Sequence, residues 1–497
     1  MSPLRYDPRM PTPTSLRRLP SVDAVLRHEA LVEALAQVPR PLVVAAVREV
    51  IGEARQQLAA PKRSRARAKR NGGAAPDGAR TPDPAALARL AAVRAFAEHR
   101  PQLVRVLNAT GVVLHTNLGR SPLPEAARRA VDEAARGYSS LEYDLATGKR
   151  GQRGLGVERW LTRLTGAEAA LVVNNGAAAI LLVLSAIASG KKVIVSRGEL
   201  VEIGGSFRVP DVMAKSGATL VEVGTTNRTH LRDYERALER HADVGAILRV
   251  HRSNFRIEGF TAEPDLRALA ALARKRKVPL IEDLGSGALV DVAPLGMEPE
   301  PTVRERLTAG CDVVTFSGDK LLGSTQAGLV LGRKRWVDRA RRDPLARALR
   351  VDKLTLAALE ATLPIYLDPA RALREIPALA MLHASSEVLE TRARRLADLI
   401  RREAPDLKVG VEPGVGEVGG GALPMAHLPG WVVTIEAPSR SAVELEERAR
   451  AAMPAVLGTI RNGRFRLDVR TLSDTDVEEA AHTIARAQHG SAGAERE

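Results

Sequence analysis

The chain alternates short apolar segments with longer amphipathic stretches over most of its 497 residues. Between Val106 and about Gly332, strand-like runs rich in Val, Ile and Leu are separated by segments of helical periodicity. The runs are ALVVNN, KKVIVS, ATLVEVG, GAILRVH, VPLIED, CDVVTFSG and AGLVLGR. This alternation predicts an α/β fold with a mostly parallel sheet and helices on both faces. Ligands of such sheets bind at the carboxyl ends of the strands.

The amino-terminal region, residues 1–58, predicts a small helical module. Apolar residues recur at helical spacing over 21–37, where Ser21 is a suitable N-cap, and again over 41–58. Residues 59–84 are mainly Ala, Pro, Gly, Lys and Arg, with almost no large apolar side chain. Such a segment cannot bury enough surface to order itself, so we expect a flexible basic linker.

A third helix, PAALARLAAVRAFAEH, leads into the large domain, which we place at residues 85–368. Residues 369–497 then contain a long helix (EVLETRARRLADLIRREA), a Gly-rich turn (GVGEVGGGALP) and the strand WVVTIEA. This pattern predicts a smaller α+β domain at the carboxyl-terminal end.

Composition limits the class of protein. The longest apolar run, AAAILLVLSAIA, has 12 residues and would span about 18 Å as a helix, which is too short to cross a membrane. The amino terminus lacks the apolar core of a secretory signal, and the single cysteine, Cys311, excludes an internal disulfide framework. We therefore expect a cytoplasmic protein with no membrane association.

The net charge of +15 is unevenly distributed. Residues 1–100 hold 18 Lys and Arg against 9 Asp and Glu, which suggests a polyanionic partner such as nucleic acid. An Arg-rich, Ala-rich composition of genomic origin is the alternative, because the linker segment PKRSRARAKR alone supplies six of these cations. Charge by itself does not identify the partner.

A lysine and an aspartate mark the candidate chemistry. Lys320 follows the strand-like run CDVVTFSG and lies among small residues, and Asp283 ends the run VPLIED, 37 positions earlier. Two residues at strand ends of one parallel sheet face the same crevice. Pyridoxal phosphate requires this pair, because a lysine amine binds its aldehyde and a carboxylate holds its ring nitrogen protonated. Burial would lower the pKa of Lys320 and make the amine available as nucleophile and proton carrier.

A third element predicts where the cofactor phosphate binds. The run ALVVNN ends in the turn Asn174, Asn175 and Gly176, and a helix begins near Ala177. Free amides and the helix dipole at such a start favour an anion, and glycine lets the phosphate approach the main chain. Ser317 is an additional hydroxyl donor, and Ser286 is a weaker candidate.

Eight further motifs resemble the bacterial selenocysteine synthase, or L-seryl-tRNA(Sec) selenium transferase, family. They are NATGVVLHTNLGRSPL (108–123), YSSLEYDLATGKRGQRG (138–154), VNNGAAAILLVLSA, SRGELVEIGGSFRVPDVM, GTTNRTHLRDYERAL, VHRSNFRIEGF, EDLGSGAL and TFSGDKLLGSTQAG. The likeness covers nearly the whole chain, includes the amino-terminal LPSVDAVLR segment and is weakest in the linker.

The resemblance implies a fold-type-I transferase that uses pyridoxal 5'-phosphate and no metal, with Lys320 forming the internal aldimine and Asp283 under the ring nitrogen. Seryl-tRNA(Sec) would lose water by β-elimination to give an aminoacrylyl intermediate, which would accept selenium from selenophosphate. The resemblance also implies a homo-oligomer of dimers, a decamer, in which the amino-terminal module grips tRNA. RNA recognition of that kind would depend on shape and backbone contacts.

Four further residues receive roles through the resemblance. Arg120, Arg347 and Arg350 match the family pattern and would clamp the phosphate-like selenium donor, for which guanidinium forks are suited. Arg347 and Arg350 are three positions apart, so we expect them to share a helix face. His251, at the end of GAILRVH, would contact the cofactor or protonate the departing hydroxyl, or else simply pack at the strand end.

Three alternatives remain open. A pyridoxal phosphate-dependent lyase acting on a small free amino acid would share the same core, but the helical module argues against it. A cysteine desulfurase needs a mobile nucleophilic cysteine, whereas Cys311 begins a buried-looking strand. A tRNA-binding protein without catalysis would have no need to retain Lys320 and Asp283. The sequence leaves open the subunit number, the basis of tRNA(Sec) discrimination and the acid that protonates the leaving hydroxyl.

Overall fold

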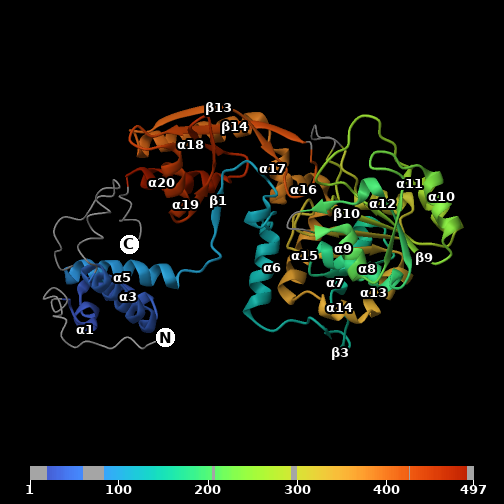
Figure 1. Ribbon diagram of the computed structural model, residues 1–497, viewed down its shortest axis with the longest axis horizontal. Coiled ribbons are helices and arrows are strands. Elements are labelled where there is room, and N and C mark those ends of the chain that lie inside the picture. Colours follow the sequence, from blue (N-terminus) through green and yellow to red (C-terminus); the bar gives the residue numbers. More distant parts are fainter. Residues whose placement is uncertain (1–18, 60–82, 204–206, 293–298, 425, 490–497) are drawn as a thin grey trace, which may run out of the picture. The chain divides into compact units, whose positions relative to one another are not determined.

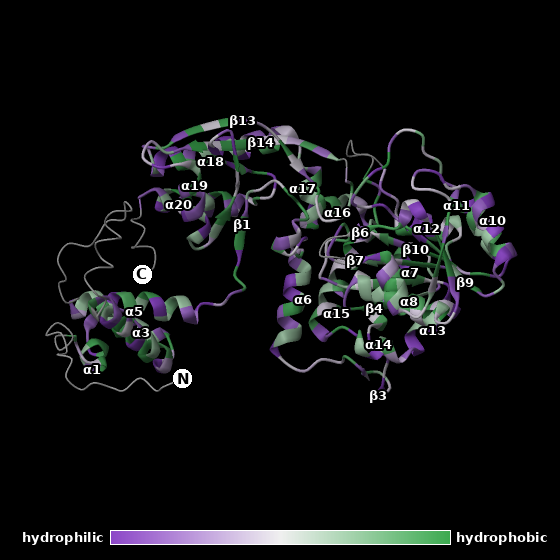
Figure 2. Cartoon of the chain, viewed as in Figure 1, coloured by the Kyte–Doolittle hydropathy of each residue, from purple (hydrophilic) through white to green (hydrophobic). Residues whose placement is uncertain are grey.

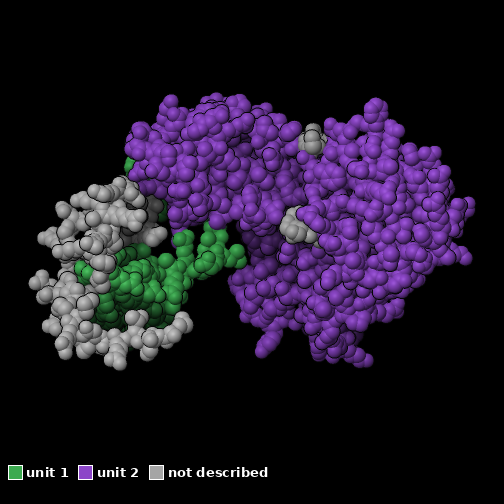
Figure 3. All heavy atoms as spheres, viewed as in Figure 1, with its two compact units in different colours: residues 1–105, 486–497 green, residues 106–485 purple. Residues whose placement is uncertain are grey.

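The computed structural model describes residues 19–59, 83–203, 207–292, 299–424 and 426–489. The chain divides into two compact units, which Figure 3 colours separately. Unit 1 comprises residues 1–105 and 486–497, and unit 2 comprises residues 106–485.

Unit 1 is helical in its described part. Its elements are α1 (Val22–Leu26), η2 (Glu29–Leu31), α2 (Val32–Gln37), α3 (Arg40–Ala59) and α5 (Pro84–His99). The helix predicted over 41–58 is confirmed as α3. The segment 21–37 is not one continuous helix, because His28 has an extended backbone and its Nδ1 accepts a hydrogen bond from the amide of Ala30, which starts a new turn. The N-cap at Ser21 is confirmed.

Helix α5 belongs to unit 1, and its inclusion in a large domain over 85–368 is therefore corrected. Its residues Leu87, Ala88, Ala91 and Ala95 are buried in the same core as the apolar side chains of α3. A helix with one apolar stripe must bury that stripe, and α3 provides the matching surface. The expected basic linker, 59–84, lies almost entirely outside the described residues.

The core of unit 2 is a seven-stranded sheet (Figure 1). Its order is β4 (Ala169–Val173), β12 (Gly328–Gly332), β11 (Val313–Ser317), β10 (Leu280–Gly285), β9 (Val244–Val250), β5 (Lys192–Ser196) and β8 (Thr219–Val223). Only β12 runs antiparallel to its neighbours within this sheet. Each of the seven predicted strands is present, so the mostly parallel α/β sheet is confirmed.

Helices cover both faces of this sheet. One face packs α7 (Leu155–Thr165), α10 (Leu231–Arg240), α11 (Leu266–Lys275) and α12 (Val303–Ala309). The other packs α8 (Gly176–Ala188), α9 (Val209–Lys215) and α13 (Lys334–Arg342). Figure 2 shows α8 as largely hydrophobic, which agrees with its burial against the central strands.

Further elements surround the sheet. They are η3 (Thr116–Leu118), α6 (Glu125–Arg136), β2 (Tyr143–Asp144), β3 (Lys149–Arg150), η4 (Arg197–Glu199), β6 (Glu202–Ile203), β7 (Phe207–Arg208), α14 (Pro344–Ala348), α15 (Lys353–Thr362), η6 (Leu363–Leu367), α16 (Pro369–Glu375) and α17 (Pro377–His383). Helices α16 and α17 contribute to a core shared with Leu321, beside the candidate site.

The carboxyl-terminal part of unit 2 is an α+β layer, as expected. Its antiparallel sheet has the order β13 (Lys408–Glu417), β14 (His427–Glu436), β17 (Arg464–Asp468) and β16 (Thr459–Arg461), with helices α18 (Ser386–Glu403), α19 (Ala442–Ala451) and α20 (Asp474–His489). The first part of the expected Gly-rich turn, Gly414–Glu417, is instead the end of β13, because it pairs with β14.

Strand β1 (Val106–Asn108) pairs in parallel with β15 (Ala455–Leu457). A strand within the expected large domain therefore pairs with the carboxyl-terminal part of the chain. Among the helices of the described ranges, none combines the length and the apolar character needed to cross a bilayer.

Candidate active site at the strand ends

Lys320 and Asp283 lie on neighbouring strands of the main sheet. Asp283 is in β10, and Lys320 follows the end of β11 by three residues. Register pairs Asp283 with Thr315 of β11, and the Thr315 hydroxyl donates a 2.9 Å hydrogen bond to Oδ1 of Asp283. Lys320 is only 5% exposed, and the turn around it is fixed by a 2.9 Å hydrogen bond from the Gly323 amide to the Lys320 carbonyl. Thus the predicted pair meets at one edge of the sheet.

Burial shifts the ionisation of both groups. It lowers the pKa of Lys320, and the guanidinium of Arg120 lowers it further, whereas Asp283 and other nearby carboxylates oppose the shift. Burial raises the pKa of Asp283 to about 6, although the Thr315 hydroxyl and the Lys320 ammonium act in the opposite direction. The site therefore favours the neutral form of the Lys320 amine. The ionised form of Asp283 depends on a cationic partner.

The predicted anion site forms at the start of α8. Asn175 is the N-cap, and its Oδ1 accepts a 2.8 Å hydrogen bond from the Ala178 amide. The amides of Gly176 and Ala177 belong to the first turn, where a helix offers no partner of its own. A Cβ at Gly176 would lie 2.6 Å from the Ser317 hydroxyl, so a side chain there would displace this hydroxyl. The chain thus brings two amides and a hydroxyl together.

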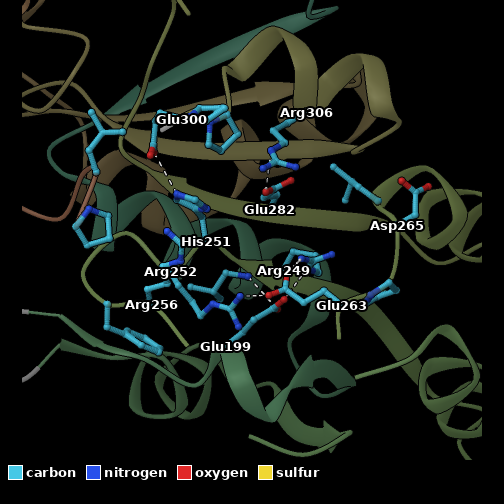
Figure 4. Close-up of a pocket in the computed structure, with 18 of the residues that line it drawn as sticks. Glu199, Arg249, His251, Arg252, Arg256, Glu263, Asp265, Glu282, Glu300 and Arg306 are labelled. Atoms are coloured by element: carbon cyan, nitrogen blue, oxygen red, sulfur yellow. Dashed lines mark hydrogen bonds and ion pairs between the residues drawn. The ribbon is translucent and has the colours of Figure 1, made fainter. Parts of the chain in front are cut away.

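His251 lies next to Asp283 in the sheet. Its amide donates a 2.9 Å hydrogen bond to the Asp283 carbonyl. Its Nε2 lies 3.1 Å from Oε1 of the buried Glu300, within ion-pair distance but without the alignment of a hydrogen bond (Figure 4). Both residues line a polar cavity of about 460 Å³ that Leu423 also borders. A carboxylate oxygen therefore faces the imidazole of His251 at the cavity wall.

Arg120 is near the lysine, as the resemblance implies. Its Nη1 donates a 2.7 Å hydrogen bond to Oδ2 of Asp319, the residue that precedes Lys320. Arg120 also has a φ of 60°, which is uncommon for a residue other than glycine and is concentrated at functional sites. The sequence reading missed Asp319, although its position next to the lysine was a usable signal.

Arg347 and Arg350 border a different cavity from the one that His251 lines. They line a second cavity of about 360 Å³, together with Glu142 and Arg153, and Lys320 is not part of that lining. The expectation that they share a helix face is wrong, because α14 ends at Ala348 and Arg350 lies beyond it. The backbone nevertheless ties this region to the anion site, since the Asn174 amide donates a 2.9 Å hydrogen bond to the Leu349 carbonyl.

The residues at the strand ends fit pyridoxal phosphate. A buried amine, a buried carboxylate and a helix start with a nearby hydroxyl match the aldehyde, the ring nitrogen and the phosphate of that cofactor. The buried hydroxyl of Ser286 makes no hydrogen bond with other described residues, as expected for a group that faces a bound ligand. The sequence missed Thr315, because its role depends on strand register.

Comparisons with known proteins agree with this geometry. Residues 106–473 match the L-seryl-tRNA selenium transferase family, and residues 16–55 match the selenocysteine synthase N-terminal family. L-seryl-tRNA(Sec) selenium transferase from Geobacter sulfurreducens is 50% identical, over 93% of this chain and 97% of that protein. The enzyme of the same name from Nitratidesulfovibrio vulgaris is 55% identical, over 78% and 82%.

A solved structure, D-glucosaminate-6-phosphate ammonia-lyase, shares the fold with a TM-score of 0.51 at 20% identity, covering 78% of this chain and 97% of that one. The expected fold-type-I architecture is thereby confirmed. Together with the matches over most of the sequence, these observations show that the chain belongs to the L-seryl-tRNA(Sec) selenium transferase family, whose cofactor is pyridoxal 5'-phosphate.

Proposed function

We propose that the protein converts seryl-tRNA(Sec) to selenocysteinyl-tRNA(Sec) with selenophosphate as the selenium donor. In net terms, the serine hydroxyl is exchanged for a selenol and selenophosphate becomes phosphate. The observation that carries the proposal is the convergence of Lys320, Asp283 and the start of α8 at one sheet edge, in a chain about 50% identical to enzymes of that name.

Three groups of this chain would hold the cofactor. Lys320 binds its aldehyde, Asp283 holds its ring nitrogen, and the amides of Gly176 and Ala177 with the Ser317 hydroxyl receive its phosphate. When bound, the cofactor supplies an electron-accepting ring that makes the Cα–H bond of an attached amino acid acidic. Asp283 strengthens this effect because a buried carboxylate favours a protonated ring nitrogen.

Proton movement falls to Lys320 and His251. The Lys320 amine, whose pKa is lowered by burial, is suited to take the Cα proton of the seryl group near neutral pH. His251, beside Glu300, is positioned to give a proton to the departing serine oxygen. A hydroxyl leaves as water far more readily than as hydroxide, so this step needs an acid.

The three arginines are assigned to the selenium donor. Arg120 acts beside Lys320, whereas Arg347 and Arg350 offer guanidinium groups in the second cavity. Guanidinium forks bind phosphate-like groups bidentately. This assignment predicts weaker use of selenophosphate when any of the three is removed.

We assign tRNA binding to the helical module of unit 1 and propose a cytoplasmic homo-oligomer of dimers, a decamer. A deletion of residues 1–58 would expose the apolar stripe of α5, so removal of residues 1–100 is the cleaner test. It should abolish tRNA binding in a gel-shift assay while leaving cofactor absorbance unchanged. Unchanged tRNA affinity would refute this role of the helical module. The proposed decamer is tested separately, by measuring the number of subunits with light scattering.

The decisive experiment supplies the purified holoenzyme with seryl-tRNA(Sec) and selenophosphate and identifies the aminoacyl product by mass spectrometry. Selenocysteinyl-tRNA(Sec) is the expected product. Turnover of free serine or a related amino acid without any change in seryl-tRNA would instead identify a lyase. A protein without cofactor absorbance that still binds tRNA would identify a binding protein.

A further inference from the structure

One of three consecutive glycines in the segment between β13 and β14 approaches the amine of Lys320. Gly419, Gly420 and Gly421 all have left-handed backbones, with φ of 72°, 61° and 78°. A Cβ at Gly421 would lie 3.1 Å from Nζ of Lys320, so a side chain there would crowd the amine. The carboxyl-terminal part of the chain thus faces the reacting group with bare backbone.

A buried hydroxyl points into the same space. Ser253 is 1% exposed, and its Oγ makes no hydrogen bond with any other described residue. A Cβ at Gly421 would lie 3.4 Å from this oxygen, and a Cβ at Gly285 would lie 3.8 Å from both this oxygen and Nζ of Lys320. Buried hydroxyls are rarely left without a partner. The orphaned Ser253 hydroxyl therefore indicates a ligand atom between two glycine turns, beside the amine.

The charges around Lys320 indicate which ligand atom this is. The charged groups that act most strongly on the amine are Arg120, Asp283, Asp319 and Glu300. The one guanidinium of this set is already bonded to Asp319. A free amino acid would bring an anionic carboxylate into this set, in which three carboxyl groups outnumber one guanidinium. An esterified amino acid brings a neutral carbonyl, which needs only an uncharged donor.

We propose that Ser253 and Gly421 form a subsite for the carbonyl of an esterified α-carboxyl group, and that this subsite selects aminoacyl esters over free amino acids. The Ser253 hydroxyl donates to the ester carbonyl oxygen. Gly421 leaves room for the ester beside the amine, where a side chain would fill the space. This inference rests on the proposed function and specifies how the site distinguishes its substrate class.

The first test uses the wild-type holoenzyme without a selenium donor. L-serine methyl ester and L-serine are titrated separately, and equilibrium binding is followed by the change in cofactor absorbance. Affinities are compared after correction for the fraction of each ligand whose amine is unprotonated at the working pH. We expect the ester to bind at least about tenfold more tightly. Equal or tighter binding of L-serine would overturn the proposal.

The second test asks whether Ser253 carries the preference. Ser253→Ala should weaken ester binding by about three- to tenfold, the range of one neutral hydrogen bond, and leave L-serine binding unchanged. Ser253→Thr, which keeps the hydroxyl, should restore part of the preference. Ser216→Ala is the control, because Ser216 is also buried but its hydroxyl donates to the Met213 carbonyl at the end of α9, and it should leave the ratio of the two affinities unchanged. An unchanged ratio in Ser253→Ala would contradict the assignment.

A third measurement separates a carbonyl site from an anion site. Calorimetric titration of the apoenzyme with inorganic phosphate should give the same affinity for the wild type and Ser253→Ala. Weaker phosphate binding in the variant, with unchanged ester binding, would show that the hydroxyl serves an anion and would overturn the proposal. None of these readouts depends on selenocysteinyl-tRNA formation, so failure of that reaction would count against the proposed function alone.

Discussion

Lys320 and Arg347 are both cations that sequence reasoning assigns to one reaction, but they occupy opposite environments. Lys320 is buried among small residues at the strand ends, and burial lowers the pKa of its amine. Arg347 is exposed on α14, at the edge of a separate cavity lined by both arginines and carboxylates. Burial can turn a charged group into a reactive one, whereas exposure preserves its charge for binding. Substitution of Lys320 should therefore impair the chemical step, and substitution of Arg347 should impair substrate binding.

The largest effect is expected at Lys320. Lys320→Ala should lower the transfer rate by roughly 10²–10⁴-fold or more, because it removes the proton carrier and the amine that binds the cofactor. The cofactor trapped by borohydride should also be lost, as measured by absorbance after denaturation. Lys334→Ala, at an exposed lysine paired with Asp338, is the control and should retain both. Cofactor trapped in Lys320→Ala would show that another lysine binds it.

The next effect concerns the stability of the apoprotein. Because the pKa of Asp283 rises from 3.8 to about 6 on folding, the folded chain binds this proton more tightly than the unfolded chain. The contribution of this group is therefore most favourable below about pH 4 and is lost as pH rises to about 6, by about 3 kcal/mol in all.

The variant Asp283→Asn should not lose folding stability in this way as the pH rises. The difference in unfolding free energy between the variant and the wild type, measured in urea, should grow in favour of the variant from pH 4 to pH 7. Asp132→Asn, at an exposed carboxylate of α6, should show no such trend. A parallel dependence on pH in Asp283→Asn and the wild type would mean that Asp283 is not desolvated.

A smaller effect is expected in the arginine cavity. Arg347→Ala should raise the KM for selenophosphate by about ten- to a hundredfold, the range of a hydrogen bond to a charged group, and change the KM for seryl-tRNA little. Arg394→Ala, at an exposed arginine of α18, is the matched control. Equal loss for both substrates would point to a folding defect and would remove the distinction between the two regions.

The smallest effect concerns Glu142, which lies 3.6 Å from Arg350. Glu142→Gln should leave Arg350 with more of its charge available and lower the KM for selenophosphate by up to about fivefold, because exposed ion pairs contribute little. Steady-state kinetics at low salt would measure it. A raised KM would show that Glu142 orients Arg350 for the donor instead of competing with it.

The sequence alone determined the seven strands of the main sheet and the pairing of Lys320 with Asp283. Apolar runs at strand length and small-residue turns at their ends are local signals, and the carboxyl ends of neighbouring parallel strands lie together by geometry. The helix start at Gly176 was predictable for the same reason, since the strand, the glycine and the apolar helix are contiguous.

Only the tertiary structure decided which residues from distant segments surround the amine. Thr315 contacts Asp283 through strand register, Glu300 reaches His251 from outside the strands, and Gly421 approaches Lys320 from the carboxyl-terminal layer. Local sequence also did not predict that α5 packs on α3, because the packing partner of a helix depends on the rest of the fold. It did not predict that α14 ends before Arg350, because the last turn of a helix depends on contacts elsewhere in the chain. Pattern fixes the elements, but the juxtaposition of side chains depends on how those elements pack.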